Sequence, residues 1–289
     1  MITNNSKLTI FVSTHKPYSK IRDYKPYVPI QLGKALHPDL DLGYQCDNEG
    51  DNISHKNASW NELTGLYWVW KNFNQSEYVG FCHYRRYFDV ELNDENIDKM
   101  MKGADILVAR THFGRMRSDN IYSLCISTSS EDAWIFVDTM LKMHPEYADG
   151  IKQALFDNHI FFPFNMFIMS RKLFNEYCEF IMPVLTEVEK IIKPHGYSRL
   201  DRTIGYMGEW SLGCFIISHK LKFKELPWLS TEYISHTKPP KKLSFRKELK
   251  RSIKYYFEIN RKHKHIFLEA PNDVLMGLQK DGITLNNIK

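Results

Sequence analysis

Leu8-Thr-Ile-Phe-Val-Ser13, near the start of the chain, is a short apolar run rich in β-branched and aromatic residues. It passes directly into the polar residues Thr14-His15-Lys16-Pro17. A continuous apolar run with polar boundaries predicts a buried strand of an α/β domain, whose loop lies at the carboxyl edge of the sheet. Ligands of open α/β sheets bind at that edge. We therefore expect Thr14, His15 and Lys16 to line a ligand site.

Further apolar runs alternate with amphipathic stretches along the chain. The predicted strands cover 77–82, 105–109, 165–169 and 221–226, and the predicted helices cover 131–143 and 171–192. Pro183 is expected to bend or split the second helix, and Ser170 is expected to cap it. A loop followed by a helix is expected over 205–219. This order predicts a mixed α/β domain with a helical tail.

Another predicted helix begins near Ser59-Trp-Asn-Glu62, which matches the capping-box pattern. Leu63, Leu66, Tyr67 and Trp70 follow at the spacing of one apolar helix face, and Lys71-Asn72 closes the helix. The pattern predicts that Glu62 serves as the capping acid. It also predicts that Tyr67 and Trp70 belong to the core.

The composition favours one sizeable folded body. Of the 289 residues, 43% are hydrophobic and 14% aromatic, which excludes disorder for most of the length. The net charge of +5 is too small to indicate nucleic-acid binding. Five cysteines without C-x-x-C spacing predict free thiols in a reducing compartment. The chain lacks a signal-peptide pattern and an apolar stretch long enough to span a bilayer, so we expect a cytoplasmic protein.

The positive charge is concentrated near the end of the chain. Residues 238–264 hold eleven Lys/Arg and two Glu, a local charge of +9 that leaves −4 for the rest. Phe245, Leu249, Ile253 and Tyr256 recur at helical spacing, which predicts a basic helix with an apolar seam. Such a helix suits an anionic membrane surface, so we expect peripheral binding to the inner face of the cell membrane; packing of the seam on the body is the alternative.

The same contrast in charge divides the chain. We expect an α/β domain over 1–235 and a basic helical extension over 236–289. RNA binding through the basic aromatic tail is a competing interpretation. The acidic balance of the body argues against it, and we expect no nucleic-acid partner.

His83-Tyr84-Arg85-Arg86-Tyr87 directly follows the predicted strand over 77–82. Two adjacent arginines at the mouth of a sheet are costly unless an anion meets them, and guanidinium groups fit phosphate oxygens bidentately. The tyrosines add stacking faces and hydroxyl donors. The run predicts a phosphate site with His83, Tyr84, Arg85 and Arg86 as its contacts. Ion pairs of the arginines with carboxylates across the rim are the alternative.

A second polar segment, Asp51-Asn-Ile-Ser-His-Lys-Asn57, precedes the predicted helix. A loop of this composition before a helix N-terminus can hold a base, a ribose and a diphosphate, because helix N-termini favour anions. A polar loop that only caps the helix is an equal alternative. Asp51, Lys56 and Asn57 are the candidate contacts, and Trp60 offers a stacking face.

Metal-ligand spacing is weak in this sequence. Asp39-Leu-Asp41 formally matches an Asp-x-Asp pair for Mn²⁺ or Mg²⁺, but it stands before Gly43 without a preceding strand, which predicts a turn. The histidines outside the motifs show no ligand spacing, and glycine-rich phosphate loops and nucleophile signatures are absent. We therefore predict that no metal cofactor is required, although the sequence leaves Mn²⁺ or Mg²⁺ open.

Several of these runs together resemble a known family. They are Asp51-Asn-Ile-Ser, Asn57, Glu62-Leu-Thr-Gly-Leu-Tyr-Trp-Val-Trp-Lys-Asn72, Val79-Gly-Phe-Cys-His-Tyr-Arg-Arg-Tyr-Phe88 and Asn165-Met-Phe-Ile-Met169. The chain is similar over roughly 8–228 to a bacterial polysaccharide-biosynthesis family catalogued as a domain of unknown function, number 4422. Its members occur in capsule, exopolysaccharide and O-antigen loci, and some are assigned as galactofuranosyltransferases.

The resemblance implies a GT-A-like nucleotide-diphosphosugar transferase fold with a mixed central sheet. In that fold a metal-binding Asp-x-Asp follows a central strand, and here His83 to Tyr87 occupies that place. The late acid that serves as base in inverting enzymes would correspond to Glu209. The family pattern usually has Arg after this acid, whereas this chain has Trp210. We expect Asn165 and Trp210 on the acceptor side.

The resemblance therefore implies a hexosyltransferase that uses a uridine-diphosphate sugar, with galactofuranose as one candidate. The acceptor would be a glycan or lipid-linked glycan of a surface polysaccharide. A non-catalytic peripheral membrane scaffold of a polysaccharide assembly complex is the alternative. Donor hydrolysis that depends on Glu209 would separate the two.

Overall fold

The computed structural model describes residues 6–113, 119–192, 201–232, 245–260 and 269–288. Its centre is a mixed sheet whose main path runs β10-β6-β9-β4-β1-β2-β3. β1 pairs in parallel with β2 and β4, whereas β9 pairs antiparallel with both β4 and β6. The expectation of a mixed central sheet is thus confirmed. The strands are β1 Leu8–Thr14, β2 Tyr27–Gln31, β3 Gln45–Cys46, β4 Tyr78–His83, β5 Arg86–Phe88, β6 Ile106–Ala109, β7 His112–Phe113, β8 Ile160–Phe161, β9 Phe167–Ser170, β10 Phe223–Leu226 and β11 Trp228–Ser230.

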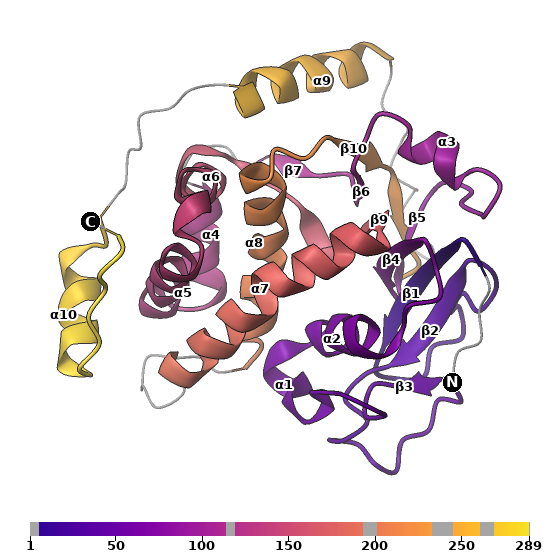
Figure 1. The fold of residues 1–289 in the computed structure, drawn as a ribbon, viewed down its shortest axis with the longest axis horizontal. Helices are drawn as coiled ribbons and strands as arrows, with labels where there is room; N and C mark the ends of the chain where they lie inside the picture. Colours follow the sequence, from indigo (N-terminus) through magenta and orange to yellow (C-terminus); the bar gives the residue numbers. More distant parts are fainter. Residues whose placement is uncertain (1–5, 114–118, 193–200, 233–244, 261–268, 289) are drawn as a thin grey trace.

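Helices cover one face of this sheet and form a group beside it. Figure 1 shows α7 lying diagonally across the sheet, with α2 below it and with α4, α5, α6 and α8 grouped to its left. The α-helices are α1 Asn57–Trp60, α2 Leu63–Asn72, α3 Ile97–Met101, α4 Asp119–Ser127, α5 Ser130–Met143, α6 Ala148–Lys152, α7 Arg171–Ile192, α8 Thr203–Ser218, α9 Phe245–Asn260 and α10 Asn272–Lys280. Short helical turns are η1 Ser54–Lys56, η2 Pro145–Tyr147, η3 Gln153–Asp157 and η4 Pro163–Asn165.

The central strands are buried on both faces, which explains their continuous apolar runs. Alternate side chains enter different cores: Phe11 and Phe81 join the core beneath α2 and α7, whereas Ile10, Val12 and Cys82 join the core on the other face. Every residue of β1 is buried. The sheet therefore holds its loops on a rigid base.

The strand directions place several loops at one edge. β1, β2 and β4 run in parallel, and β6 runs the same way because both it and β4 are antiparallel to β9. β10 is parallel to β6. The residues that follow Thr14, His83, Ala109 and Leu226 consequently meet at the same carboxyl edge, where ligands of such sheets bind.

Several sequence predictions are confirmed. β1, β4, β6, β9 and β10 lie where strands were expected, and α5 and α7 span the expected helices. Pro183 lies inside α7, which remains one helix. Ser170 caps it, since its Oγ accepts a hydrogen bond from the Leu173 backbone N–H at 3.2 Å. The five cysteines are free thiols, and the Gly43 N–H donates to Asp41 Oδ1 at 2.8 Å, as a turn requires.

The predicted capping box is wrong. Ser59 lies inside α1, Asn61 adopts a positive φ of 49°, and α2 begins only at Leu63. Glu62 occupies the N-cap position of α2, but its side chain makes no capping hydrogen bond. The helix is therefore interrupted at Asn61, and the Glu62 carboxylate remains available for another partner.

The predicted loop at the start of 205–219 is also wrong, because α8 is helical from Thr203. Its glycines serve close packing. A Cβ on Gly205 would lie 2.2 Å from Asn61 Nδ2, and a Cβ on Gly208 would lie 2.7 Å from Leu63 Cδ1. These glycines let α8 approach the break between α1 and α2.

The last segment packs against the body. Val274 and Leu278 of α10 are buried in the main core, beside α5. Asp138 of α5 accepts hydrogen bonds from the backbone N–H groups of Asn286 and Asn287 at 2.9 and 2.6 Å. Among the described residues, no helix has both the length and the apolar character that a membrane crossing would need.

Candidate active site

Basic side chains gather at the carboxyl edge of the sheet. Partial desolvation lowers the pKa of the exposed His15, and the positive charges of Lys16 and Arg85 lower it further, with smaller effects from His83 and Arg202. The buried Tyr84 ring supports this cluster: His15 contacts it edge-on at 5.4 Å, and the Lys16 ammonium lies 5.7 Å from its centre. A concentration of positive charge at such an edge suits an anionic ligand.

Arg85 also has a protein partner. Its Nη1 donates to Glu232 Oε1 at 3.0 Å, and its carbonyl accepts from the Thr231 N–H at 2.9 Å. The ion pair that the sequence left open as an alternative is thus present. The Arg85 side chain remains 33% exposed, so it can still contact a ligand from the solvent side.

The charge of Arg86 interacts with those of several acidic residues. Burial and the neighbouring Arg85 lower its pKa, whereas the charges of Glu209, Glu232 and Glu62 raise it. Its guanidinium lies 4.2 Å from the centre of the Phe164 ring. Arg86 therefore joins the basic cluster at the rim to the carboxylates beneath it.

The turn η4 connects these groups. Its residues Phe164 and Asn165 adopt positive φ values of 70° and 48°, which are uncommon outside glycine. The half-buried His83 donates from Nε2 to the Phe164 carbonyl at 2.6 Å, and the Phe164 N–H donates to Glu209. Asn165 Nδ2 donates to Glu62 Oε1 at 3.0 Å. The strained turn thereby fixes His83, Glu62 and Glu209 relative to one another.

Glu62 and Glu209 form a carboxylate pair. Burial raises the pKa of Glu209 to about 8, and the charge of Glu62 is the second cause. A neighbouring negative charge disfavours ionisation of a partly desolvated carboxyl group such as that of Glu209. The sequence does not predict a site role for Glu62, because its match to a capping box accounts for the residue. No motif around Arg202 indicates a site role for that residue either.

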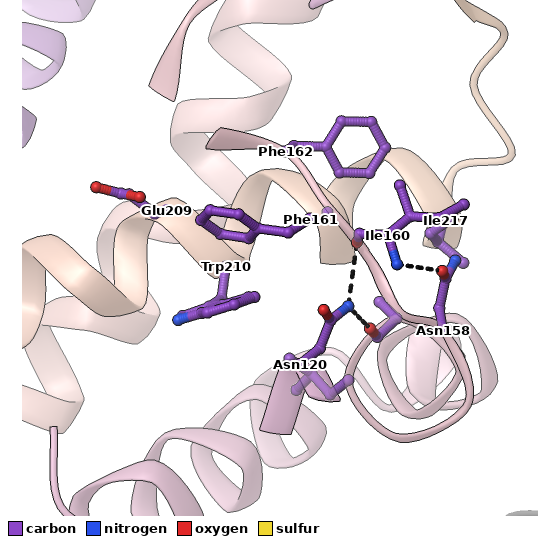
Figure 2. Close-up of a pocket in the computed structure, with 11 residues that line it drawn as sticks. Asn120, Asn158, Ile160, Phe161, Phe162, Glu209, Trp210 and Ile217 are labelled. Carbon is purple, nitrogen blue, oxygen red and sulfur yellow. Dashed lines mark hydrogen bonds between the residues drawn. The ribbon is translucent and has the colours of Figure 1, made fainter. Parts of the chain in front are cut away.

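A small closed cavity lies beside Glu209. Figure 2 shows Phe161 and Trp210 next to it, and their rings are tilted by 43° with centres 4.1 Å apart. The Glu209 carboxylate points away from Asn120. Asn120 Nδ2 donates to the Ala154 and Ile160 carbonyls at 2.7 and 3.1 Å, so its amide is engaged in holding the backbone. The cavity serves packing, and Trp210 forms a wall next to the acid.

The family model described as Domain of unknown function (DUF4422) matches residues 9–220. The chain belongs to the DUF4422 family. The matched range contains Glu62, the His83–Arg86 run, Asn165 and Glu209. No curated protein sequence matches the chain.

A solved structure titled "WbbM bifunctional glycosytransferase apo structure" resembles the DUF4422 chain, with a TM-score of 0.65 and 27% sequence identity. The match covers 78% of this chain and 45% of the WbbM chain. The DUF4422 chain thus has a glycosyltransferase-like α/β fold. It spans less than half of the WbbM structure that it matches.

The remaining predicted donor contacts of the DUF4422 chain are engaged within the fold. Glu189 of α7 accepts hydrogen bonds from Lys56 Nζ and Trp60 Nε1, and Trp60 is only 1% exposed, which leaves no ring face for stacking. The Asn57 amide donates to the Asn61 carbonyl and to Thr64 Oγ1, while Asp51 accepts from the Tyr67 hydroxyl. These side chains hold α1 and α2 in place.

Of the residues at the end of β1, Thr14 is engaged within the fold, whereas His15 and Lys16 face solvent. Thr14 is buried, and its hydroxyl donates to the Lys16 carbonyl at 3.2 Å, whereas the His15 and Lys16 side chains are exposed. Thr14 therefore shapes the loop that presents the two basic residues. In the part of the chain that the structure describes, no group of three or more His, Cys, Asp or Glu is placed to hold a metal ion.

Proposed function

We propose that this protein is a glycosyltransferase that moves a hexosyl unit, with galactofuranosyl as one candidate, from a UDP-sugar onto a surface-polysaccharide acceptor. The supporting observation is the juxtaposition of a basic rim with two half-buried, electrostatically interacting carboxylates at one edge of a glycosyltransferase-like sheet. A sugar diphosphate needs cations at its phosphates, and its acceptor needs a base. Both requirements are met within one site.

The donor diphosphate binds at the basic rim in this proposal. Arg86, Arg85, Lys16 and His15 offer charge-assisted donors to the phosphate oxygens, and they would stabilise the negative charge that develops on the leaving diphosphate. Arg202, at the start of α8, adds a further charge next to His15. The rim thereby supplies the electrostatic role that a metal ion performs in many sugar-nucleotide enzymes.

Glu209 is the proposed base of an inverting transfer. The acceptor hydroxyl oxygen bonds to the anomeric carbon while the bond from that carbon to the diphosphate breaks. The hydroxyl proton passes to the Glu209 carboxylate, and UDP leaves with the bonding electrons. A base with a pKa of about 8 accepts a proton readily and is still ionised in part near neutral pH.

Glu62 is a positioning residue in this scheme. Asn165 fixes its carboxylate at 3.0 Å, and its negative charge raises the proton affinity of Glu209. Asn165 Oδ1 is buried and has no hydrogen-bond partner among the described residues. An acceptor hydroxyl would satisfy it, in line with the expected acceptor side of the site.

The test begins with donor binding. Thermal shifts with UDP and a panel of UDP-sugars, each with and without EDTA, identify the nucleotide that stabilises the fold. Transfer or hydrolysis of that donor is then compared between the wild type and Glu209→Gln. We expect Glu209→Gln to bind the donor normally and to lose about 100-fold or more in turnover.

The outcomes separate the proposal from a non-catalytic scaffold. Wild-type turnover in Glu209→Gln on the true acceptor would remove Glu209 from the mechanism. Donor binding without hydrolysis or transfer by the wild type, across the panel and with lipid-linked glycan acceptors, would favour the scaffold.

A further inference from the structure

Helix α9 is fixed to the body by ion pairs along one side. Arg251 donates to both carboxylate oxygens of Glu225, at 2.8 and 3.0 Å, and to the Thr111 carbonyl at 2.6 Å. Arg110 donates to Glu248 at 2.7 Å. Burial alone would raise the pKa of Glu225, but the hydrogen bonds from Arg251 and Thr111 hold it below its usual value. The Arg251–Glu225 pair is partly buried and bidentate, so it defines which side of α9 faces the body.

The opposite side of α9 presents a row of large apolar residues to solvent. Leu249, Ile253, Tyr256 and Phe257 are 50%, 48%, 66% and 64% exposed. The first three recur at steps of four and three, which lines one helix face, and the residues that contact the body lie about half a turn away. Phe245, which the sequence placed on the same seam, belongs to α9, but its side chain lies outside the described part.

This row is unusual for a water-soluble surface. Four of the large exposed apolar residues among those described lie together on α9. The others are spread over several elements. Contiguous exposed apolar side chains mark an interaction surface. The alternative that the sequence left open, packing of the seam on the body, is contradicted for Leu249, Ile253 and Tyr256.

Basic side chains border the apolar row. Arg246, Lys247, Lys250 and Lys254 are exposed on α9. A helix with an apolar face, a basic border and low overall hydrophobicity is the kind that lies flat in the interface of an anionic bilayer. RNA would use the charges but would leave the apolar row in water.

The position of α9 relates this surface to the candidate active site. Its anchors Arg110 and Thr111 directly follow β6, and Glu225 lies on β10. Both strands end at the carboxyl edge, the edge to which the His83–Arg86 run also belongs. Figure 1 shows α9 on the outside of the molecule, beside the ends of β7 and β10.

We propose that the outer face of α9 docks on an anionic phospholipid surface, with Leu249, Ile253, Tyr256 and Phe257 inserted between headgroups and the neighbouring lysines on lipid phosphates. Docking of this kind would hold the carboxyl edge near acceptors that are carried on lipid. The docking itself does not depend on the proposed transfer.

The test is flotation of the full chain with vesicles of phosphatidylglycerol and phosphatidylcholine, compared with vesicles of phosphatidylcholine alone. We expect flotation with the anionic vesicles at low salt and release at high salt. The double variant Leu249→Ser/Ile253→Ser should lower the partition coefficient by about tenfold or more. Lys247→Gln/Lys250→Gln should lower it by a similar factor at low salt, with little effect on phosphatidylcholine.

Tyr122→Ser/Met276→Ser is the matched control, because these residues are 62% and 60% exposed on other helices. It should float like the wild type, and all variants should retain the circular dichroism spectrum and the turnover on a water-soluble acceptor. Equal partitioning of the α9 variants and the wild type would overturn the proposal. Two other results would also overturn it. In the first, the wild type does not float but forms a dimer that the serine variant no longer forms. In the second, the wild type does not float but binds RNA in a salt-sensitive way. None of these outcomes bears on whether Glu209 is a base.

Discussion

At the scale of single residues, the candidate chemistry depends on two carboxylates that lie far apart in the sequence. Glu62 and Glu209 are 147 positions apart, and η4 links them through Asn165 and Phe164. Desolvation and the charge of Glu62 both raise the pKa of Glu209. Three predictions concern the site at this scale.

The first prediction concerns the pH profile. Because Glu209 must be ionised to accept a proton and its pKa is about 8, kcat/KM should rise with pH and level off above about 8. Glu62→Gln removes the second-largest cause of that high pKa, so the rising limb should move to lower pH. Asp51→Asn, an exposed carboxylate outside the pair, is the control and should leave the limb in place. An unchanged limb in Glu62→Gln would contradict the coupling.

The second prediction concerns stability. The pKa of Glu209 is raised from 4.5 to about 8 in the folded chain, so between these pH values the folded chain holds a proton that the unfolded chain releases. The free energy of unfolding therefore falls as the pH rises through this window. Glu209→Gln removes the penalty, and its Tm should exceed that of the wild type by a few degrees more above pH 8 than near pH 4.5. Calorimetry at several pH values measures this difference, and a gap that does not depend on pH would count against it.

The third prediction separates the two arginines. Arg86→Ala should weaken binding of the donor nucleotide by about 1.5–3 kcal/mol, the scale of a charge-assisted hydrogen bond. Arg85→Ala should also weaken it, but by less, because Arg85 already spends part of its hydrogen-bonding capacity on Glu232. Isothermal titration with the nucleotide measures both. Unchanged affinity in both variants would remove the arginines from the donor site.

At the scale of elements, the approach of α8 to the α1–α2 break places one carboxylate against the other. Gly205 and Gly208 form the contact surface of α8, and the positive φ of Asn61 turns Glu62 toward the site. A methyl group at either glycine would displace the Asn61 or the Leu63 side chain. Close helix packing at this junction therefore supports the backbone positions of Glu62 and Glu209.

The fourth prediction tests this packing. Gly205→Ala places a Cβ 2.2 Å from Asn61 Nδ2 and 3.2 Å from Asn61 Cβ, so the Asn61 side chain must shift out of its packing against α8. The free energy of unfolding should drop by about 1–3 kcal/mol through overpacking, and turnover should fall as the carboxylates separate. Gly213→Ala is the control on the same helix, where the added Cβ meets a Phe162 ring carbon at 3.3 Å. Chemical denaturation should show a larger loss in the free energy of unfolding for Gly205→Ala than for Gly213→Ala. Equal losses would contradict the prediction that packing is tighter at the junction of α8 with α1 and α2.

At the scale of the whole molecule, one sheet edge carries the basic rim, the acid pair and the anchors of α9. The chain outside 238–264 has a formal charge of −4, so the basic rim stands out against a mildly acidic body. Within the described residues, acidic and histidine side chains do not gather into a metal-binding group.

The fifth prediction follows at this scale. If the arginines bind the donor diphosphate as proposed, transfer by the full chain should persist in EDTA, because their guanidinium groups supply positive charge at the phosphates. Turnover with EDTA, and after addition of Mn²⁺ or Mg²⁺, measures the dependence. Activity that EDTA abolishes and Mn²⁺ restores would show that the donor site uses a metal ion.

The sequence alone determined the features that depend on local pattern. The buried strands β1, β4 and β6 followed from continuous apolar runs, and α5 and α7 followed from helical periodicity, because each pattern is complete within its own segment. The His83–Arg86 run and Glu209 were identified as candidates from their residue types and from the family resemblance. The basic amphipathic character of α9 was also legible in its spacing.

Only the tertiary structure decided which candidates meet. Ser59 and Glu62 matched a capping box, yet Asn61 breaks the helix, because packing against Gly205 and the hydrogen bond from Asn57 outweigh local helix propensity. Lys56 and Trp60 donate hydrogen bonds to Glu189, and Arg85 donates to Glu232. These partners lie more than a hundred residues away in the sequence. A sequence pattern specifies which face of an element is apolar, but the partner of a charged side chain depends on elements that fold against it from distant parts of the chain.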